Sequence, residues 1–170
     1  MLITTKVDYA IKCVLHLSID QFGYISVTNL SKKLIIPKHY LAKILQALVK
    51  SGIAESQQGK QGGFKLRKKP EEISMWDVFV SLNALPVIYK CVGENFTCKN
   101  EKVCSTKPVW VELGDYVVER LKNTQFGDLG KKQFNSMQSA IFTKSDFLNS
   151  PGPKSEEKKK GKVLPIKLKN

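Results

Sequence analysis

The sequence predicts a mostly α-helical chain with one small β-hairpin: a winged helix-turn-helix followed by a long C-terminal dimerisation helix. Three observations support this fold class. Two helical stretches are separated by only three residues, as in a helix-turn-helix. A glycine-rich, basic hairpin follows them directly. Farther along, one long stretch repeats apolar residues at helical spacing and stands apart from that module.

The charge of the chain is high and unevenly placed. Its 170 residues include 28 Lys and Arg against 15 Asp and Glu, for a net charge of +13. Residues 32–69 hold ten basic side chains and one acid, Glu55. This balance favours a polyanionic partner. The chain has neither a long apolar run nor a secretory signal at its start, so we expect a cytoplasmic protein without a membrane partner.

The first predicted helix covers residues 5–19, where apolar residues recur every three or four positions. Cys13 lies beside this apolar stripe, and we interpret it as a small buried residue rather than a reactive or ligating thiol. After a turn at residues 22–24, Ser26 is placed to cap a short helix over residues 27–34, because its hydroxyl can accept hydrogen bonds from the first amides.

The next helix is predicted to begin at Pro37, whose missing amide hydrogen costs nothing in a first helical turn. It ends before Gly52, which supplies a left-handed stop. Its buried stripe consists of Leu41, Ile44, Leu45 and Leu48. The same spacing occurs in proteins that bind no DNA, so this helix pair alone only suggests a nucleic-acid reader.

The hairpin makes the interpretation more specific. Residues 53–56 and 64–67 read as strands around a glycine-rich turn at residues 57–63. The glycines allow a tight tip that can approach another backbone closely. A helix-turn-helix followed by a basic hairpin is the winged-helix arrangement, in which a helix enters the major groove and the hairpin meets phosphates or the minor groove.

Two more helices are predicted. Ser74 opens a capping-box-like start for a fourth helix that runs to about residue 85 and closes the core with Val78, Phe79 and Leu82. A fifth helix runs from about residue 108 to 123 with an apolar stripe along it. The stripe consists of Val109, Leu113, Tyr116, Val117 and Leu121. It favours homodimerisation, and the alternative is packing against its own chain.

These elements divide the chain into four segments. They are a winged-helix DNA-binding domain (1–86), a cysteine-rich loop (87–107), a dimerisation helix with the segment after it (108–130), and a C-terminal extension (131–170). From about residue 150 we expect a flexible basic tail, because its Pro, Gly, Ser and Lys cannot repay the entropy of ordering. A solvated tail is favoured over a DNA-tethering arm.

Three of the four cysteines, Cys91, Cys98 and Cys104, fall within fourteen residues of one loop. Thiolates are the soft ligands that zinc and iron–sulfur clusters select, and three of them leave one position for a weaker ligand. On spacing alone, a cluster, a structural zinc and a thiol switch remain open. The common enzyme motifs do not occur and both histidines are isolated, so we expect no enzyme.

Three stretches, residues 2–11, 40–53 and the wing 56–66, together with the cysteine loop, resemble the Rrf2 family of winged-helix transcription regulators. The likeness covers about residues 1–130. It implies a homodimeric regulator, expected to be a repressor, that binds palindromic double-stranded promoter DNA. It also implies an iron–sulfur cluster, 2Fe–2S or 4Fe–4S, on the three loop cysteines. Because the family includes an iron–sulfur-cluster regulator and a nitric-oxide-sensing repressor, the expected signals are nitric oxide, redox stress or cluster supply.

Relatives complete the cluster with a ligand that is not cysteine. The resemblance points to Asp8 of the partner subunit, with Glu94 or a water as alternatives. Other relatives use a histidine three residues beyond the last cysteine, where this chain has Lys107, which cannot ligate iron while protonated. The first cysteine gap also holds six residues where five are usual, and Gln58 stands where many relatives have a minor-groove arginine.

We expect the DNA contacts to come from the helix pair and the wing. The candidate residues are Thr28, Lys38, His39, Tyr40 and Lys43 on the helices, and Gln58, Lys60 and Gln61 on the wing. Tyr40 packing inward and His39 being merely solvated remain alternatives. Two rival functions also stay open: a cluster-free regulator that responds through thiol oxidation or a partner protein, and a small iron–sulfur electron carrier.

Overall fold

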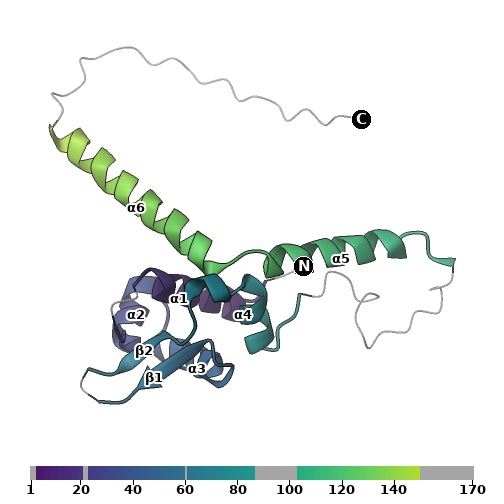
Figure 1. Cartoon of the computed structure of the whole chain (residues 1–170), viewed down its shortest axis with the longest axis horizontal. Helices are drawn as coiled ribbons and strands as arrows, with labels where there is room; N and C mark the ends of the chain where they lie inside the picture. Colours follow the sequence, from purple (N-terminus) through teal and green to yellow (C-terminus); the bar gives the residue numbers. More distant parts are fainter. Residues whose placement is uncertain (1–2, 21–22, 60, 87–102, 150–170) are drawn as a thin grey trace, which may run out of the picture. The chain divides into compact units, whose positions relative to one another are not determined.

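A computed structural model describes residues 3–20, 23–59, 61–86 and 103–149, with only the backbone described for residues 140–149. The elements in chain order are α1 (Thr5–Ile19), α2 (Val27–Leu34), α3 (Lys38–Lys50), β1 (Ala54–Gln57), β2 (Gly63–Leu66), the 3-10 turn η1 (Pro70–Glu72), α4 (Met75–Ser81), α5 (Lys107–Lys122) and α6 (Phe126–Asn149). This order confirms the predicted winged helix-turn-helix with a long helix after it (Figure 1).

The chain forms two compact units, Met1–Ser136 and Met137–Asn170. In the second unit, the described residues 137–149 continue the helix α6. No helix in the described part of the chain is both long and apolar enough to cross a membrane.

Local capping interactions set where the helices begin. The Ser26 hydroxyl accepts a hydrogen bond from the Asn29 amide at 3.2 Å, which starts α2 as predicted. At α4, the Asp77 amide donates to the Ser74 hydroxyl and the Ser74 amide donates to the Asp77 carboxylate, so the predicted capping box is present. This helix ends at Ser81 instead of about residue 85, since Asn83 takes a left-handed φ of 49°.

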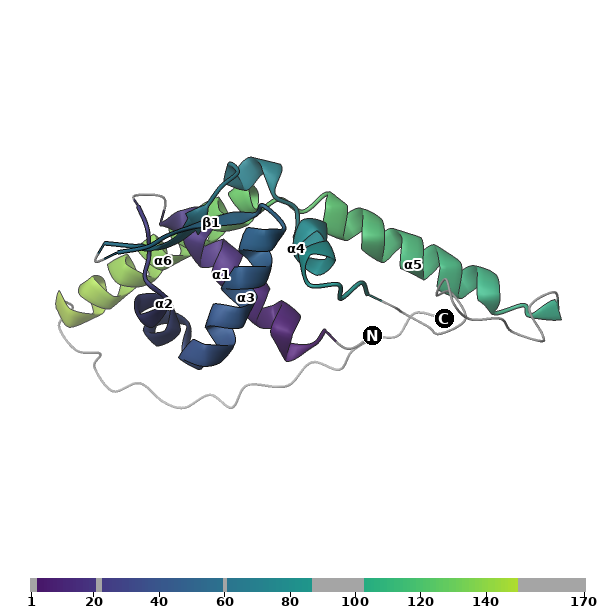
Figure 2. The same ribbon diagram turned by 90° about the horizontal axis from the view of Figure 1, so that it is seen from below.

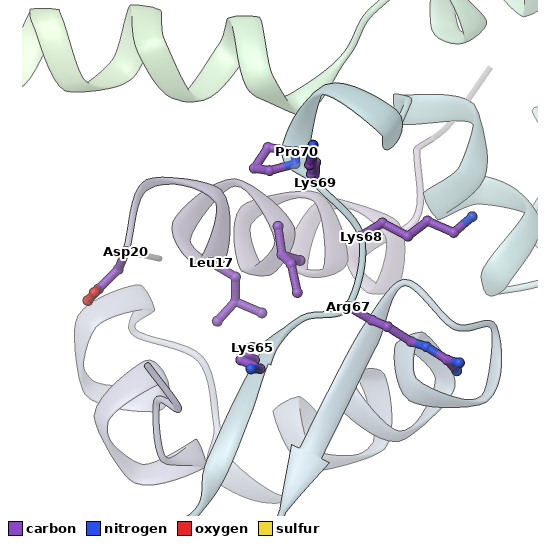
Figure 3. Close-up of a pocket in the computed structure, with 8 residues that line it drawn as sticks. Leu17, Asp20, Lys65, Arg67, Lys68, Lys69 and Pro70 are labelled. Carbon is purple, nitrogen blue, oxygen red and sulfur yellow. The ribbon is translucent and has the colours of Figure 1, made fainter. Parts of the chain in front are cut away.

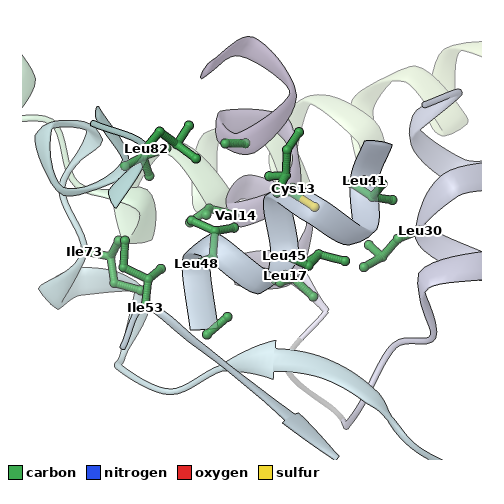
Figure 4. Close-up of a cluster of buried hydrophobic side chains, with 14 of the residues drawn as sticks. Cys13, Val14, Leu17, Leu30, Leu41, Leu45, Leu48, Ile53, Ile73 and Leu82 are labelled. Carbon is green, nitrogen blue, oxygen red and sulfur yellow. The ribbon is translucent and has the colours of Figure 1, made fainter. Parts of the chain in front are cut away.

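The core lies between α1, α3 and the elements packed on them (Figure 4). The predicted stripe of α3 is fully buried, as are Val78 and Phe79 of α4. Cys13 is completely buried, and burial raises the pKa of its thiol to about 12. The prediction that Cys13 is a small core residue is therefore confirmed.

The wing is an antiparallel hairpin that is tied to the chain before α2. In β1 and β2, Ala54 pairs with Leu66 and Ser56 pairs with Phe64. The Ile25 amide donates to the Phe64 carbonyl at 3.0 Å, and the Phe64 amide donates back at 2.9 Å. The backbone of Gly63 lies so close to Ile25 that a Cβ there would collide with it. This is the close approach that the glycine-rich turn predicts.

The chain returns from α5 to the winged module through a short bridge. The Met75 amide donates to the Thr124 carbonyl, and the Phe126 amide donates to the Ile73 carbonyl, both at 2.9 Å. Phe126 is then fully buried in the core, at the first residue of α6. Neither the helix α6 nor this core contact was predicted from the sequence, where a C-terminal extension was expected from residue 131 and no element after the fifth helix.

Candidate nucleic-acid interface and cysteine site

The helix α3 presents two different faces. Its apolar stripe packs into the core, whereas Lys38, His39 and Lys43 are exposed. Pro37 lies one residue before the helix, so the exposed Lys38 and His39 form its first turn. An exposed, basic N-terminal half is what a recognition helix needs in order to reach phosphates and base edges. The structure thus brings these three predicted residues onto one solvent-facing side of α3.

Tyr40 differs from its neighbours on α3. It is half-buried and packs against the core. Its ring meets the ring of Tyr9 in an edge-on arrangement, with centroids 5.8 Å apart. This contact fastens the first turn of α3 to α1. The inward packing that the sequence left open as an alternative is therefore present.

The remaining predicted contacts lie at the start of α2 and at the wing tip. Thr28 is exposed in the first turn of α2, directly after the Ser26 cap. Gln58 and Gln61 are exposed at the tip, which is closed by a hydrogen bond from the Gly62 amide to the Gly59 carbonyl at 3.0 Å. Lys60 lies outside the described residues.

A polar cluster supports the base of the wing. Glu55 of β1 accepts a hydrogen bond from the Tyr24 hydroxyl at 2.8 Å and forms an ion pair with Lys65 of β2 at 3.2 Å. The ammonium of Lys65 also lies 4.7 Å from the centre of the Tyr24 ring. The Tyr24 hydrogen bond first, and Lys65 second, hold the pKa of Glu55 below its usual value. Glu55, the one acid of residues 32–69, is therefore ionised, and its negative charge is paired with Lys65.

Beside this cluster the structure has a basic hollow of about 270 Å³ (Figure 3). Its lining residues are Leu17, Asp20, Lys65, Leu66, Arg67, Lys68, Lys69 and Pro70. Lys33 approaches the acid of this hollow, Asp20, at 3.6 Å. The exposed cations Arg67, Lys68 and Lys69 extend the positive surface beyond the candidate residues. The excess of basic residues over residues 32–69 was the sequence signal that could have placed these three among the predicted DNA contacts.

Cys104 is the loop cysteine that the structure describes, and it lies half-buried just before α5. Its sulfur is 3.3 Å from the Thr106 hydroxyl oxygen. Hydrogen bonding from the Thr106 side chain, followed by the amides of Thr106 and Lys107, lowers the pKa of this thiol. A stabilised thiolate is the form that ligates a soft metal or reacts with an oxidant, so the donor chemistry fits both interpretations.

The other proposed ligands are not brought together in the described part of the chain. Cys91, Cys98 and Glu94 lie outside the described residues. Asp8 sits in the first turn of α1 and forms an ion pair with Lys12 at 2.7 Å. Among the described residues, no three His, Cys, Asp or Glu side chains gather as a metal site.

The apolar stripe of α5 divides into two parts. Val109, Leu113 and Tyr116 are 54%, 43% and 65% exposed, although all three are large and apolar. Val117 is half-buried, and Leu121 packs against the core of its own chain. In Figures 1 and 2, α5 lies outside the bundle of α1–α4. The stripe therefore packs inward at its C-terminal end and faces solvent along the rest of its length.

Comparison with known proteins gives a consistent result. Residues 3–132 match the Rrf2 family, described as an iron-dependent transcriptional regulator. The protein rrf2 of Nitratidesulfovibrio vulgaris is 28% identical over 130 residues, covering 76% of this chain and 87% of that protein. The HTH-type transcriptional regulator IscR of Aliivibrio salmonicida is also 28% identical over 130 residues, with coverages of 76% and 77%.

Solved structures agree with the sequence relatives. CymR (YrzC), the global cysteine regulator of B. subtilis, superposes with a TM-score of 0.65 and 25% identity, covering 78% of this chain and 98% of that one. The oxidized form of Staphylococcus aureus CymR gives a TM-score of 0.61 and 26% identity, with coverages of 76% and 96%. The fold is shared with T. potens IscR, at a TM-score of 0.60, 21% identity and coverages of 78% and 88%.

Proposed function

The chain belongs to the Rrf2 family of DNA-binding transcriptional regulators, and from this premise we propose that it is a homodimeric repressor whose hold on palindromic promoter DNA depends on its cysteine segment. As a member of a regulator family it is not an enzyme. The observation that carries the proposal is the exposed basic start of α3 beside a wing fixed to Ile25. One element can enter a groove while the other meets the backbone.

Direct contacts follow from where the side chains lie. Lys38, His39 and Lys43 are exposed on α3 and would meet phosphates and base edges, while Thr28 would bind a phosphate at the start of α2. The wing would contact the phosphates or the minor groove through Gln58, Lys60 and Gln61. Every phosphate neutralised by a lysine releases counterions, so affinity should fall steeply as salt rises.

The salt dependence provides a direct test of the DNA interface. The variant Lys38→Ala should reduce the slope of log affinity against log salt by about 1. The matched control Lys132→Ala removes an exposed lysine from α6 and should leave the slope unchanged. Fluorescence anisotropy with a labelled duplex measures both. Equal slopes for the two variants would contradict the assignment of Lys38 to the interface.

Dimerisation is supported by the solvent-facing part of α5. Val109, Leu113 and Tyr116 recur at three- and four-residue spacing and expose a continuous apolar face. A two-fold dimer buries such a face against its own copy and places two recognition helices on the two halves of a palindrome.

The cofactor proposal rests on the thiol of Cys104 and on the family match. An iron–sulfur cluster bound by Cys91, Cys98 and Cys104 would supply a centre that nitric oxide, oxidants or iron scarcity can destroy. Cys104 would bind as a thiolate, which its lowered pKa favours. Asp8 of the partner subunit would first have to release Lys12. Because Cys104 directly precedes α5, whatever holds its sulfur also fixes the start of that helix.

A second candidate is a cluster-free regulator of the same fold. It is favoured by the likeness to CymR, which includes a structure of an oxidized form. The same lowered pKa that suits metal binding makes Cys104 the more reactive of the two described thiols, since Cys13 is buried with a raised pKa. Oxidation of the loop thiols would then replace cluster loss as the signal.

Anaerobic purification separates these candidates. A brown protein with iron and sulfide, whose absorbance is lost in Cys98→Ala and Cys104→Ala but kept in Cys13→Ala, supports the cluster. A colourless protein whose DNA affinity changes on mild oxidation supports the thiol switch. Reversible redox cycling with no selective DNA binding would indicate an electron carrier. If the cluster-loaded and cluster-free forms bind the same promoter equally, the proposed control is wrong.

A further inference from the structure

Ile35, in the turn between α2 and α3, combines two unfavourable features. Its backbone is left-handed, with φ 56° and ψ 45°, and its side chain is 89% exposed. A β-branched residue in this conformation is a genuine outlier, because its Cβ crowds the following carbonyl oxygen. A fully solvated isoleucine also gains none of the stabilisation that burial gives. The other described non-glycine residue with positive φ is Asn83, a type that tolerates it.

The fold does not explain the choice of isoleucine. At the end of α2, the Ile35 amide donates to the Ser31 carbonyl, a backbone bond that any residue except proline could make. The apolar anchor of the turn is the next residue, Ile36, which is only 2% exposed. Glycine or asparagine would serve the turn with less strain. Strain that the fold does not need is characteristic of functional positions.

The surroundings of Ile35 indicate what it meets. Lys32 and Lys33 are exposed in the last turn of α2, and Lys38 and His39 are exposed in the first turn of α3. Ile35 is therefore an exposed apolar residue in a turn with exposed basic residues on both sides of it along the chain. A duplex whose phosphates bind Lys38, three residues after Ile35, is brought up to this turn. The apolar group that double-stranded DNA offers in its major groove is the C5-methyl group of thymine.

We propose that Ile35 is a specificity-determining residue that contacts a thymine methyl group at the edge of the major groove. This inference rests on the proposed DNA-binding function and deepens it, since it names one base that the turn reads. The contact offsets the cost of strain and exposure only in the complex, so the free protein carries that cost.

The test uses the full chain and a pool of randomised duplex DNA, from which the sequences bound by the wild type are enriched. In the enriched duplex, thymines are then replaced one at a time by deoxyuridine, which lacks the methyl group. Wild-type affinity should fall about fourfold at one position of each half-site, as expected for the transfer of one methyl group. The variant Ile35→Asn should be insensitive at that position and keep the wild-type response elsewhere.

Stability supplies the second readout. Ile35→Asn should raise the melting temperature by a few degrees, because asparagine accepts the left-handed backbone. The matched control Asn83→Ile places isoleucine at φ 49° away from the turn. It should lower the melting temperature and leave the selected DNA sequence unchanged.

The outcomes are distinguishable. A wild type that enriches no sequence overturns the proposed function itself. Enrichment with the same deoxyuridine response in wild type and Ile35→Asn overturns the role of Ile35 and leaves DNA binding intact. An Ile35→Asn protein that melts below the wild type overturns the strain argument, and with it this inference.

Discussion

One added carbon atom at Gly63 should break the anchoring of the wing to Ile25. In Gly63→Ala, the added Cβ would collide with the backbone of Ile25, so the hairpin must move away from the chain before α2. The two hydrogen bonds between Ile25 and Phe64, at 3.0 and 2.9 Å, would then be lost. Each backbone bond contributes about 1 kcal/mol net, so unfolding should become easier by about 2 kcal/mol.

Calorimetry or circular dichroism measures this effect as a melting temperature lower by about 4–8 °C. DNA affinity at fixed salt should fall as well, because a wing that is no longer hydrogen-bonded to Ile25 does not hold its basic side chains against the DNA phosphates. Ser56→Ala is the control: Ser56 faces Phe64 across the same hairpin and its side chain is exposed, so it should change little. A Gly63→Ala protein that melts within about 1 °C of the wild type would refute the anchoring argument.

Three further predictions concern the core, one histidine and the dimer. Phe126→Ala removes a fully buried ring and should cost about 3–5 kcal/mol of unfolding free energy, measured by urea denaturation. Burial first, then Lys33, lowers the pKa of His16 below its usual 6.5, and its buried Nε2 has no partner in the described part of the chain. The unfolded chain therefore binds a proton at His16 more readily than the folded chain does. The free energy of unfolding should keep its full value above pH 6.5 and decrease as the pH falls toward the folded pKa, and His16→Gln should reduce this pH dependence. Leu113→Glu places a charge in the exposed apolar face of α5 and should halve the mass found by light scattering, whereas Asp115→Asn should not.

Much of the winged module could be predicted because its signals are local. The cap at Ser26 and the capping box at Ser74 each depend on residues three positions apart. The stop at Gly52, with φ of 74°, is likewise a property of one residue. The burial of α3 follows from its period alone. Such features persist in the folded chain because tertiary packing reinforces them.

The start of α6 could not be predicted, because its local signal conflicts with its tertiary role. Gly127 and Gly130 have low helix propensity, so in the sequence they indicate a turn or loop rather than a helix. In the structure a Cβ on Gly127 would collide with the Glu71 side chain, and one on Gly130 would crowd the Ser18 hydroxyl. These glycines allow the helix to approach η1 and α1 closely. The same approach brings Lys131 within 3.4 Å of Glu71 and places Phe126 in the core.

The interface residues show the same division between local and distant causes. The exposure of Lys38 and His39 follows from the helix period, and both were predicted. The inward contact of Tyr40 depends on Tyr9, 31 positions earlier in the chain, so the sequence could only leave it open. For the same reason, the strain at Ile35 becomes visible only once the backbone angles are known.

The two ends of α5 explain how a change at the cysteine segment would reach the DNA-binding module. The helix spans 16 residues, or about 24 Å, with Cys104 before its start and Phe126 shortly after its end. Its last turn is tied to α4, because Lys122 lies 5.5 Å from the centre of the Trp76 ring. The hydrogen bonds of Met75 and Phe126 continue this connection into the core. In the proposed function, a displacement at Cys104 would therefore reach α4 and Ile73 through α5 and these contacts. The fully buried Phe126 anchors the chain to the core directly after α5, so it lies where the proposed control would enter the winged module.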